Sequence, residues 1–218
     1  MSERRRSKKS VSAPLYKFDR EIEAQRKCLF IGIDEAGRGP LAGPVVAAAV
    51  CLDLDKPIEG VNDSKKLQAN TRSELYEKIT REARCWGVGL ATPEEIDKVN
   101  ILQATFLAMT RAVEKLGVQW GFALVDGNRP IPEIETERQM TVVSGDARSA
   151  SIAAASILAK VTRDRIMEEY HRKYPVYDFI NNKGYATAHH RNSIIEHGLS
   201  EIHRRSFCEF ILQTSLPL

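Results

Sequence analysis

The chain reads Ile31-Gly32-Ile33-Asp34-Glu35-Ala36-Gly37-Arg38-Gly39-Pro40 where its first apolar run meets a turn of small residues. The apolar run, residues 28–33, is typical of a buried strand. Because successive residues of a strand point to opposite faces, at least one of the adjacent carboxylates, Asp34 or Glu35, would lie near the core. An unpaired buried carboxylate is costly, and a hard divalent cation would relieve that cost. Taken alone, an acidic strand end exposed to water explains this segment equally well.

Two later apolar runs also lead to carboxylates. Residues 122–125 are followed directly by Asp126, and residues 140–143 are followed closely by Asp146. Open α/β sheets place their sites where strands end. Two like charges about 4 Å apart repel by roughly 4 kcal/mol at an effective dielectric near 20, so converging carboxylates need cations. We therefore predict a catalytic metal site formed by four carboxylates: Asp34, Glu35, Asp126 and Asp146.

Several motifs, in the same order along the chain, resemble those of bacterial ribonuclease HII. The first reads Asp-Glu-Ala-Gly-Arg-Gly-Pro-Leu-Ala-Gly-Pro-Val, and a later one reads Ala-Ala-Ala-Ser-Ile-Leu-Ala-Lys-Val-Thr-Arg-Asp. The matching motifs occupy residues 34–45, 62–67, 125–128, 153–164 and 183–187, within a similarity that extends from about Phe30 to Phe207. So many ordered motifs are far more specific than any one of them. The resemblance implies the ribonuclease H-like fold.

The resemblance also implies a reaction. Ribonuclease HII hydrolyses the RNA strand of RNA/DNA hybrids and incises DNA duplexes on the 5′ side of embedded ribonucleotides, leaving 3′-hydroxyl and 5′-phosphate ends. Two Mg²⁺ or Mn²⁺ ions, roughly 3.5 to 4 Å apart, would be held by the four carboxylates with substrate bound. One ion would activate water and the other would stabilise the leaving 3′-oxygen.

Recognition of the ribose is also implied by the resemblance. Gly37, Arg38 and Gly39 match the motif that reads the 2′-hydroxyl, which is the group that separates RNA from DNA. Tyr185 matches the tyrosine that stacks on the sugar following the ribonucleotide. From the residues alone, an ordinary glycine turn is the better interpretation of the first motif, and a half-buried tyrosine beside a turn explains the second equally well.

The remaining predicted substrate-binding residues would hold the nucleic-acid backbone. Asp63, Ser64 and Lys65 match a family segment in which the lysine contacts phosphate, although Asp and Ser are also common helix-capping residues. Lys160 could point at phosphate or could simply reach out from a buried helix. Lys183 belongs to the same motif as Tyr185 and completes the set.

One position departs from the family pattern. The residue before the Gly145-Asp146 pair is usually lysine, whereas this chain has Ser144. If that lysine steers phosphate or balances the carboxylates, its charge is lost here or is supplied from elsewhere. The assignment of Asp146 rests on the Gly-Asp pair and on the motif downstream of it.

The composition suits one domain. The chain has 218 residues, of which 43% are hydrophobic and 28% charged. We divide it into a basic N-terminal segment, residues 1–27, expected to be partly disordered, and a ribonuclease H-type catalytic domain, residues 28–218. The first 14 residues hold five basic side chains and one acidic one, a charge of +4, so with a net charge of +3 the rest of the chain carries about −1. Nucleic-acid binding would then use local patches, for which the candidates are Lys65, Lys66, Lys160, Arg163, Arg165, Arg204 and Arg205.

No apolar run approaches the roughly 20 residues that cross a bilayer, and the start of the chain lacks the pattern of a signal peptide. We expect a cytoplasmic monomer that binds RNA/DNA hybrids and ribonucleotide-containing duplexes and does not bind membranes. The four dispersed cysteines are expected to be buried free thiols. Most histidines lack metal-ligand spacing and are expected to be structural or exposed: His189, His190, His197 and His203. Asp164 is expected to pair with a neighbouring arginine.

The pattern predicts an α/β fold with a central mixed five-stranded sheet flanked by helices and a C-terminal helical portion. The expected strands are residues 29–33, 45–52, 86–91, 122–125 and 140–143. The expected helices are residues 71–84, one beginning at the Thr92-Pro93-Glu94-Glu95 cap signal, 101–116 and 152–174. For residues 211–218, docking on a partner and fraying both remain open.

Other functions are also compatible with parts of the pattern. Another metal-dependent nuclease or resolvase of the same fold would share the acids but would not need a 2′-hydroxyl sensor. A non-catalytic hybrid-binding protein would not need the carboxylates. A nucleotide triphosphatase is disfavoured because the sequence has no Gly-x-x-x-x-Gly-Lys-Ser/Thr motif. Ribonuclease HIII is disfavoured because roughly 28 residues before the first strand are too few for an extra folded domain.

Overall fold

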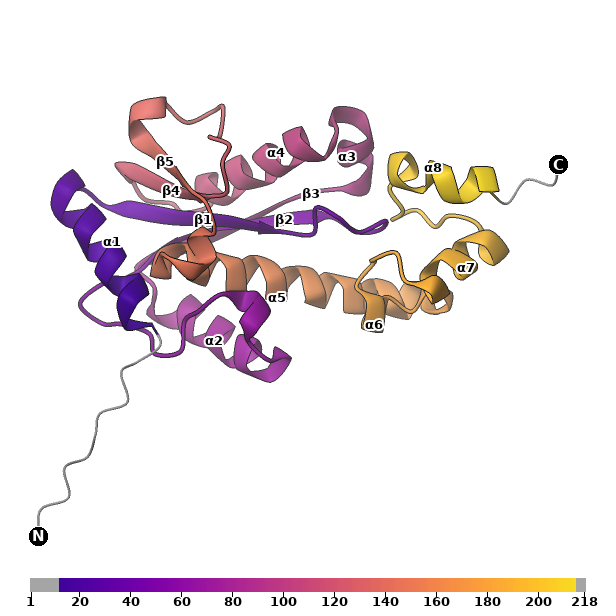
Figure 1. The fold of residues 1–218 in the computed structure, drawn as a ribbon, viewed down its shortest axis with the longest axis horizontal. Coiled ribbons are helices and arrows are strands. Elements are labelled where there is room, and N and C mark those ends of the chain that lie inside the picture. The colour runs from indigo at the N-terminus through magenta and orange to yellow at the C-terminus, as the bar shows by residue number, and fades with distance from the viewer. Residues whose placement is uncertain (1–11, 215–218) are drawn as a thin grey trace, which may run out of the picture.

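The computed structural model describes residues 12–214, which form one mixed five-stranded sheet between two layers of helices (Figure 1). The strand order is β3-β2-β1-β4-β5. β1, β2 and β3 form an antiparallel meander, whereas β4 is parallel to β1 and β5 is parallel to β4. The strands are β1 (Phe30–Ala36), β2 (Val45–Cys51), β3 (Cys85–Ala91), β4 (Phe122–Asp126) and β5 (Gln139–Val142). The predicted mixed sheet is confirmed, with strand ends shifted by at most three residues.

The largest shift concerns β1, which was expected to end at Ile33. The strand instead continues through both acids to Ala36, because β2 pairs with it over this whole stretch, with Asp34 opposite Ala48. β2 is buried along its full length and consists almost entirely of alanine and valine. These small side chains let helices pack closely on both faces of the sheet beside the acids.

Helices cover the two faces of the sheet unequally (Figure 1). One face packs against the long helix α5 and against helices α1 and α2, and the other packs against α4 and α3. The helices are α1 (Ala13–Arg26), α2 (Ala69–Glu82), α3 (Pro93–Val99), α4 (Ile101–Glu114) and α5 (Ala150–Lys173). The four helices predicted between residues 71 and 174 are confirmed, including the capping box at Thr92.

A C-terminal helical portion lies at one end of the sheet, as predicted (Figure 1). It contains α6 (Phe179–Asn182), α7 (Ala188–His197) and α8 (Arg205–Thr214) around a small apolar cluster of its own. The last part of the open C-terminal segment, residues 215–218, lies outside the described residues. Four short 3-10 turns are spread along the described residues: η1 (Ser64–Lys66), η2 (Thr136–Arg138), η3 (Gly145–Ala147) and η4 (Pro175–Tyr177).

α5 touches β1 closely enough to exclude any side chain at Gly32. A Cβ atom built on Gly32 would lie 2.2 Å from the carbonyl carbon of Ser151. The first turns of α5 contain mostly alanine and serine, and all of residues 150–159 are buried. This contact fixes the helix directly below the strand that carries the acids.

α1 was not predicted, because the sequence analysis treated residues 1–27 as a basic segment. Leu15, Tyr16 and Ile22 of this helix are buried in the main core. Its fully buried Asp19 accepts hydrogen bonds of 2.8 Å from both the backbone N–H and the hydroxyl of Ser151, at the start of α5. Burial raises the pKa of Asp19 to about 6, although the hydrogen bonds oppose that rise. The basic residues 1–11 lie outside the described residues.

The four cysteines are free thiols, two of them buried and two partly buried. Within residues 12–214, no helix is both long enough and apolar enough to cross a membrane.

Candidate active site

The parallel strands β1 and β4 bring two of the predicted acids together. Ile33 pairs with Val125, so Asp34 and Asp126 follow at the same level on neighbouring strands. In-register neighbours point to the same face, and both side chains therefore face α5. Asp146 lies in η3, just beyond the end of the third parallel strand, β5. Glu35 follows Asp34 and points to the other face by strand alternation. We call these four residues the acidic centre.

Asp34 is the most deeply buried member, with 4% of its surface exposed. Its Oδ1 accepts a 2.7 Å hydrogen bond from the backbone N–H of Glu35. Burial, together with the charges of Glu35 and Asp126, holds the pKa of Asp34 well above its usual range, although a hydrogen bond from Ser156 opposes the shift. The carboxyl thus lacks the positive partner that would normally accompany a buried charge.

Glu35 and Asp126 show the same crowding. Burial raises the pKa of Glu35, and the charge of Asp126 adds to that rise, while Arg38, whose Nη1 lies 3.5 Å from Oε1 of Glu35, lowers it. Burial also raises the pKa of Asp126, with a contribution from Asp146. A 2.6 Å hydrogen bond from the N–H of Gly145 to Oδ1 of Asp126 opposes this shift and fixes the side chain.

A cation beside Asp146 is supplied by Lys65. The ammonium of Lys65 lies 3.3 Å from Oδ2 of Asp146, and the lysine side chain is 81% exposed whereas that of Asp146 is 6% exposed. Ser144, which stands where the family usually has lysine, is exposed and has a left-handed backbone with φ 55°. The positive charge missing from the β5–η3 turn is therefore provided from η1.

The acidic centre suits a divalent cation by its chemistry. Its ligands are hard carboxylate oxygens, and three of the four have pKa values raised by burial and mutual repulsion, which a cation would reverse. Within residues 12–214, no three acidic, histidine or cysteine side chains already enclose one point. The set therefore suits an ion that arrives with further oxygen ligands, as Mg²⁺ does when it binds through one or two carboxylates and substrate phosphates.

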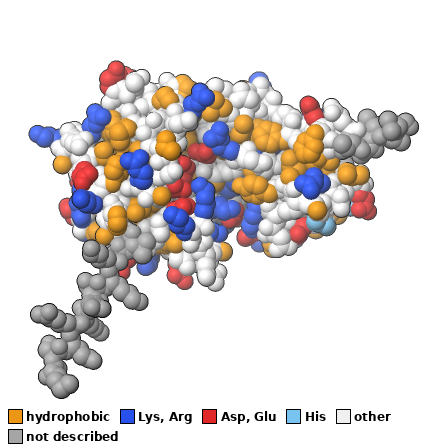
Figure 2. Space-filling model, viewed as in Figure 1, with side chains coloured by type: hydrophobic (Ala, Val, Ile, Leu, Met, Phe, Trp, Pro, Cys, Tyr) orange, Lys and Arg blue, Asp and Glu red, His pale blue; other side chains and the backbone are white. Residues whose placement is uncertain are grey.

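A cavity of about 290 Å³ opens directly beside the acidic centre. Figure 2 shows acidic side chains exposed near the middle of one face, with several basic side chains next to them. Nine predicted site residues line this cavity: Asp34, Glu35, Gly37, Arg38, Gly39, Ser64, Lys65, Lys160 and Tyr185. The other four predicted residues, Asp63, Asp126, Asp146 and Lys183, do not line it.

Two of these other residues have local structural contacts. Oδ1 of Asp63 accepts a 2.9 Å hydrogen bond from the N–H of Lys65 and so caps η1. Lys183 forms a 2.8 Å ion pair with Glu168. Lys160, at the cavity, pairs with Asp164 at 2.7 Å, so the predicted arginine partner of Asp164 is in fact a lysine.

The sequence analysis missed polar residues that support the cavity wall. The hydroxyl of Ser156 on α5 lies 2.8 Å from that of Ser64 and also hydrogen-bonds Asp34. Arg72 donates a 2.9 Å hydrogen bond to the carbonyl oxygen of Ser64. Ser156 lies one helical turn before Lys160 in the same motif, and that spacing could have placed both residues on one face.

The prediction that Arg163 and Arg204 belong to basic patches for nucleic acid is wrong. Arg163 and Arg204 are 1% and 0% exposed, so neither can reach phosphate. Their side chains instead donate hydrogen bonds to backbone carbonyls near the Gly37–Gly39 turn. Sequence reasoning had no signal for this, because any residue can supply a carbonyl partner.

Comparison with known proteins gives consistent matches. The family model described as Ribonuclease HII matches residues 31–210. Ribonuclease HII from Wolbachia pipientis subsp. Culex pipiens (strain wPip) is 51% identical over 190 residues, which cover 87% of this chain and 95% of the relative. Ribonuclease HII from Dechloromonas aromatica (strain RCB) is 56% identical over 188 residues, which cover 86% of this chain and 95% of the relative.

Solved structures share the fold. The ribonuclease H2 from Pyrococcus horikoshii OT3 is 28% identical with a TM-score of 0.68, over 85% of this chain and 98% of that chain. Bst-RNase HIII in complex with Mn²⁺ is 19% identical with a TM-score of 0.70, over 86% of this chain and 70% of that chain. This second likeness is one of fold alone.

Proposed function

The chain belongs to the ribonuclease HII family and is a ribonuclease H endonuclease, and we propose that it acts both on RNA/DNA hybrids and on single ribonucleotides embedded in duplex DNA. It hydrolyses the RNA strand of the hybrid and incises the duplex on the 5′ side of the ribonucleotide. The products carry 3′-hydroxyl and 5′-phosphate ends. One observation carries this proposal: Asp34 and Glu35 line the same cavity as the Gly-Arg-Gly turn and Tyr185.

Asp34, Glu35, Asp126 and Asp146 would hold two Mg²⁺ or Mn²⁺ ions. When bound, the ions supply an activated water and stabilise the leaving 3′-oxygen. Support comes from the raised pKa values of the carboxyl groups, which mark charges that need a cation. A further support is the Mn²⁺ complex of Bst-RNase HIII, whose fold this chain shares.

The residues around the acidic centre bind and orient the substrate. The turn of Gly37, Arg38 and Gly39 has no bulky side chain at its glycines, so its backbone can approach the 2′-hydroxyl closely. Tyr185 is 47% exposed, and a Cβ atom built on Gly39 would lie 3.8 Å from its ring. The ring is therefore placed to cover the sugar next to the one that the turn reads.

Lysines bind the phosphates on either side. Lys65 is the more exposed of the two lysines that line the cavity, and Lys160 enters from α5. Lys65 would leave Asp146 for a phosphate oxygen when substrate binds, and Asp146 would then be free to hold an ion. We also propose that the enzyme acts as a monomer and in the cytoplasm.

The test is cleavage of a DNA duplex that contains one ribonucleotide, beside an otherwise identical all-DNA duplex. The reactions contain Mg²⁺, Mn²⁺ or a chelator, and the cut site is mapped. We expect metal-dependent incision 5′ to the ribonucleotide and none in the all-DNA duplex. Cleavage of both duplexes would instead indicate a nuclease or resolvase without a ribose sensor. Binding without cleavage under any condition would indicate a hybrid-binding protein.

A further inference from the structure

Arg204 is a fully buried cation that contacts the Gly-Arg-Gly turn from behind. It lies just before α8, next to an isolated β-bridge between Ala42 and His203. Its Nη2 donates a 2.6 Å hydrogen bond to the carbonyl of Gly37, and its Nη1 donates one of 2.9 Å to the carbonyl of Arg38. Its Nε and Nη2 also donate to the carbonyl of Gly43, at 3.0 and 2.9 Å. One guanidinium thus fixes three carbonyls of the turn and the segment after it.

Burying this charge costs stability. Burial, together with the nearby charge of Arg163, lowers the pKa of Arg204 to about 9. Within residues 12–214, no carboxylate forms an ion pair with Arg204, although the more distant charge of Asp97 opposes the fall of its pKa. Its guanidinium also lies 5.2 Å from the ring of Phe207. A buried cation that is hydrogen-bonded to carbonyls and not to a carboxylate is an expensive way to gain stability but an effective way to specify one backbone conformation.

That conformation exposes two amide donors to the cavity. In a planar trans peptide, the C=O and N–H groups point in opposite directions. Because the carbonyls of Gly37 and Arg38 point inward to Arg204, the N–H groups of Arg38 and Gly39 point the other way. Both residues line the cavity. Neither N–H donates to another described residue.

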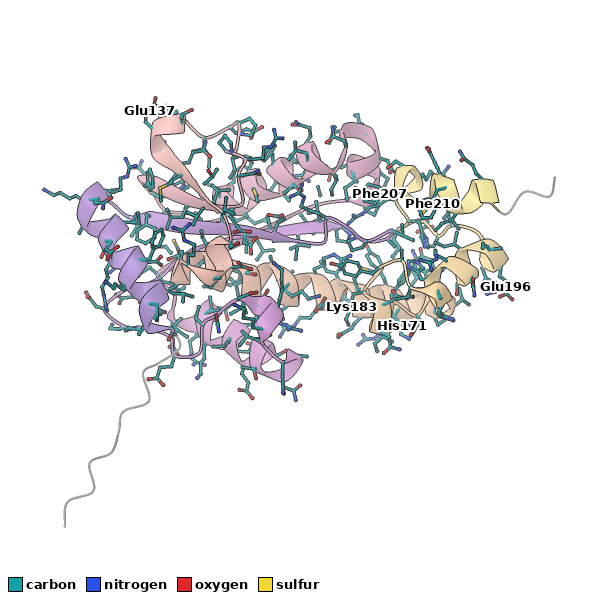
Figure 3. The ribbon with its side chains drawn as sticks, in the orientation of Figure 1. Glu137, His171, Lys183, Glu196, Phe207 and Phe210 are labelled. Carbon is teal, nitrogen blue, oxygen red and sulfur yellow. The ribbon has the colours of Figure 1, made fainter. Side chains whose placement is uncertain are left out.

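A second buried arginine links this turn to the segment that carries Tyr185. Arg163 donates hydrogen bonds of 3.0 to 3.1 Å to the carbonyls of Pro44, Ala42 and Lys183. Lys183 and Phe207 both lie at the end of the molecule that carries α6 and α8 (Figure 3). We call Arg163 and Arg204 the arginine brace.

A histidine pair fixes Tyr185 from the other side. The N–H of Ser200 donates to Nδ1 of His203 at 2.9 Å, so a neutral His203 carries its proton on Nε2. That proton is donated to Nε2 of His190 at 3.0 Å, which leaves the Nδ1–H of His190 to donate to the carbonyl of Tyr185 at 2.9 Å. Burial lowers the pKa of both rings, which favours this neutral arrangement.

We propose that Arg204 is a positioning residue for ribose discrimination, because it aims the amide donors of Arg38 and Gly39 at the 2′-hydroxyl. This inference rests on the proposed function, in which the turn reads that hydroxyl. Arg204 itself touches neither substrate nor metal. Its loss should therefore change how well ribose is told from deoxyribose more than it changes binding of the phosphate backbone.

The experiment compares binding to two duplexes that differ by one 2′-hydroxyl. The parent is Asp126→Asn, which removes cleavage, and fluorescence anisotropy with Mg²⁺ gives a dissociation constant for each duplex. Adding Arg204→Lys should lower the preference for the ribonucleotide at least fivefold while the all-DNA constant stays within about twofold. Lysine keeps the charge but cannot span three carbonyls with a planar fork.

Arg138→Lys in the same parent is the matched control. Arg138 also donates to two backbone carbonyls, those of Trp120 and Gly121, and stacks on the ring of Trp120, but it lies outside the cavity. Its replacement should leave the preference unchanged.

Each other outcome has a distinct meaning. A parent without any preference for the ribonucleotide would contradict the proposed ribose sensor itself. A parent with a preference that Arg204→Lys retains would overturn only the role of Arg204. Equal weakening on both duplexes would also overturn it, since that would indicate a general structural effect. If Arg204→Lys does not fold, Arg204→Gln is tested, because it keeps an N–H donor without the buried charge. Unfolding of both variants would assign Arg204 to global stability and overturn the proposal.

Discussion

The acidic centre and the arginine brace both lie beside the Gly-Arg-Gly turn, but their buried charges have opposite surroundings. Asp34, Glu35 and Asp126 crowd negative charge together, and burial and repulsion raise all three pKa values. Arg163 and Arg204 are buried even more deeply, yet their guanidinium groups donate hydrogen bonds to carbonyl oxygens. A buried charge left short of partners indicates a place for a ligand, whereas a buried charge that is fully matched indicates support for the backbone.

The largest expected effect concerns the acidic centre. Asp126→Asn removes one ligand charge, and we expect cleavage to fall by roughly a thousandfold or more while duplex binding is largely kept. Single-turnover cleavage with saturating Mg²⁺ measures this. Glu137→Gln, an exposed site remote from the cavity and labelled in Figure 3, serves as the control. Near wild-type cleavage by Asp126→Asn would show that the acidic centre is wrongly drawn.

Substitutions in the arginine brace should lower the free energy of unfolding. Arg163→Met removes the donor to the buried carbonyls of Ala42 and Pro44 and to the partly buried carbonyl of Lys183, and we expect the free energy of unfolding to fall by roughly 4 kcal/mol. Urea denaturation measures this. Arg165→Met, on the same helix but exposed and paired with Glu77, should cost well under about 1 kcal/mol. If both variants lose the same free energy of unfolding, the hydrogen bonds of Arg163 to the carbonyls do not support the backbone as we infer.

Asp19 is an intermediate case, because its Oδ2 accepts both hydrogen bonds from Ser151 whereas its buried Oδ1 has no hydrogen-bond partner among the described residues. Its pKa of about 6 exceeds the unperturbed 3.8, so its contribution to stability is complete below about pH 4 and is lost as pH rises through 6. Relative to Asp19→Asn, the wild type should lose about 3 kcal/mol between pH 4 and 7. Denaturation across this pH range tests the sign, with the exposed Glu21→Gln as control. If the difference in free energy of unfolding between the wild type and Asp19→Asn does not change with pH, the pKa of Asp19 is not raised in the folded protein.

The smallest expected effect concerns the repulsion between the carboxylates of the acidic centre. In chelator, Asp34→Asn relieves like-charge repulsion and should raise the free energy of unfolding by on the order of 1 kcal/mol. Saturating Mn²⁺ should remove or reverse this advantage, because the wild type binds the ion more tightly. Thermal unfolding under both conditions measures it, and the exposed Glu196→Gln should change neither (Figure 3). A destabilised Asp34→Asn in chelator would contradict the crowding of charge.

The sequence predicted the four carboxylates of the acidic centre better than it predicted α1 and the arginine brace. Strand patterns and turn signals gave the sheet, and acids placed after those strands gave the four carboxylates. α1 was missed because its few apolar residues, such as Leu15 and Ile22, stand among many charged ones. The brace was missed for a different reason. Arg204 was grouped with Arg205 as a surface patch, since its carbonyl partners have no signature in the sequence.

The contact between Arg204 and Gly37 joins positions 167 residues apart. During synthesis, β1, β4, β5 and α5 all leave the ribosome before Arg204 does, so a nascent chain can assemble its carboxylates before it can fix the turn beside them. Long-range contacts of this kind tend to form late in folding. The proposed selectivity for ribose would thus arise in the newly made enzyme only after the proposed metal site has formed.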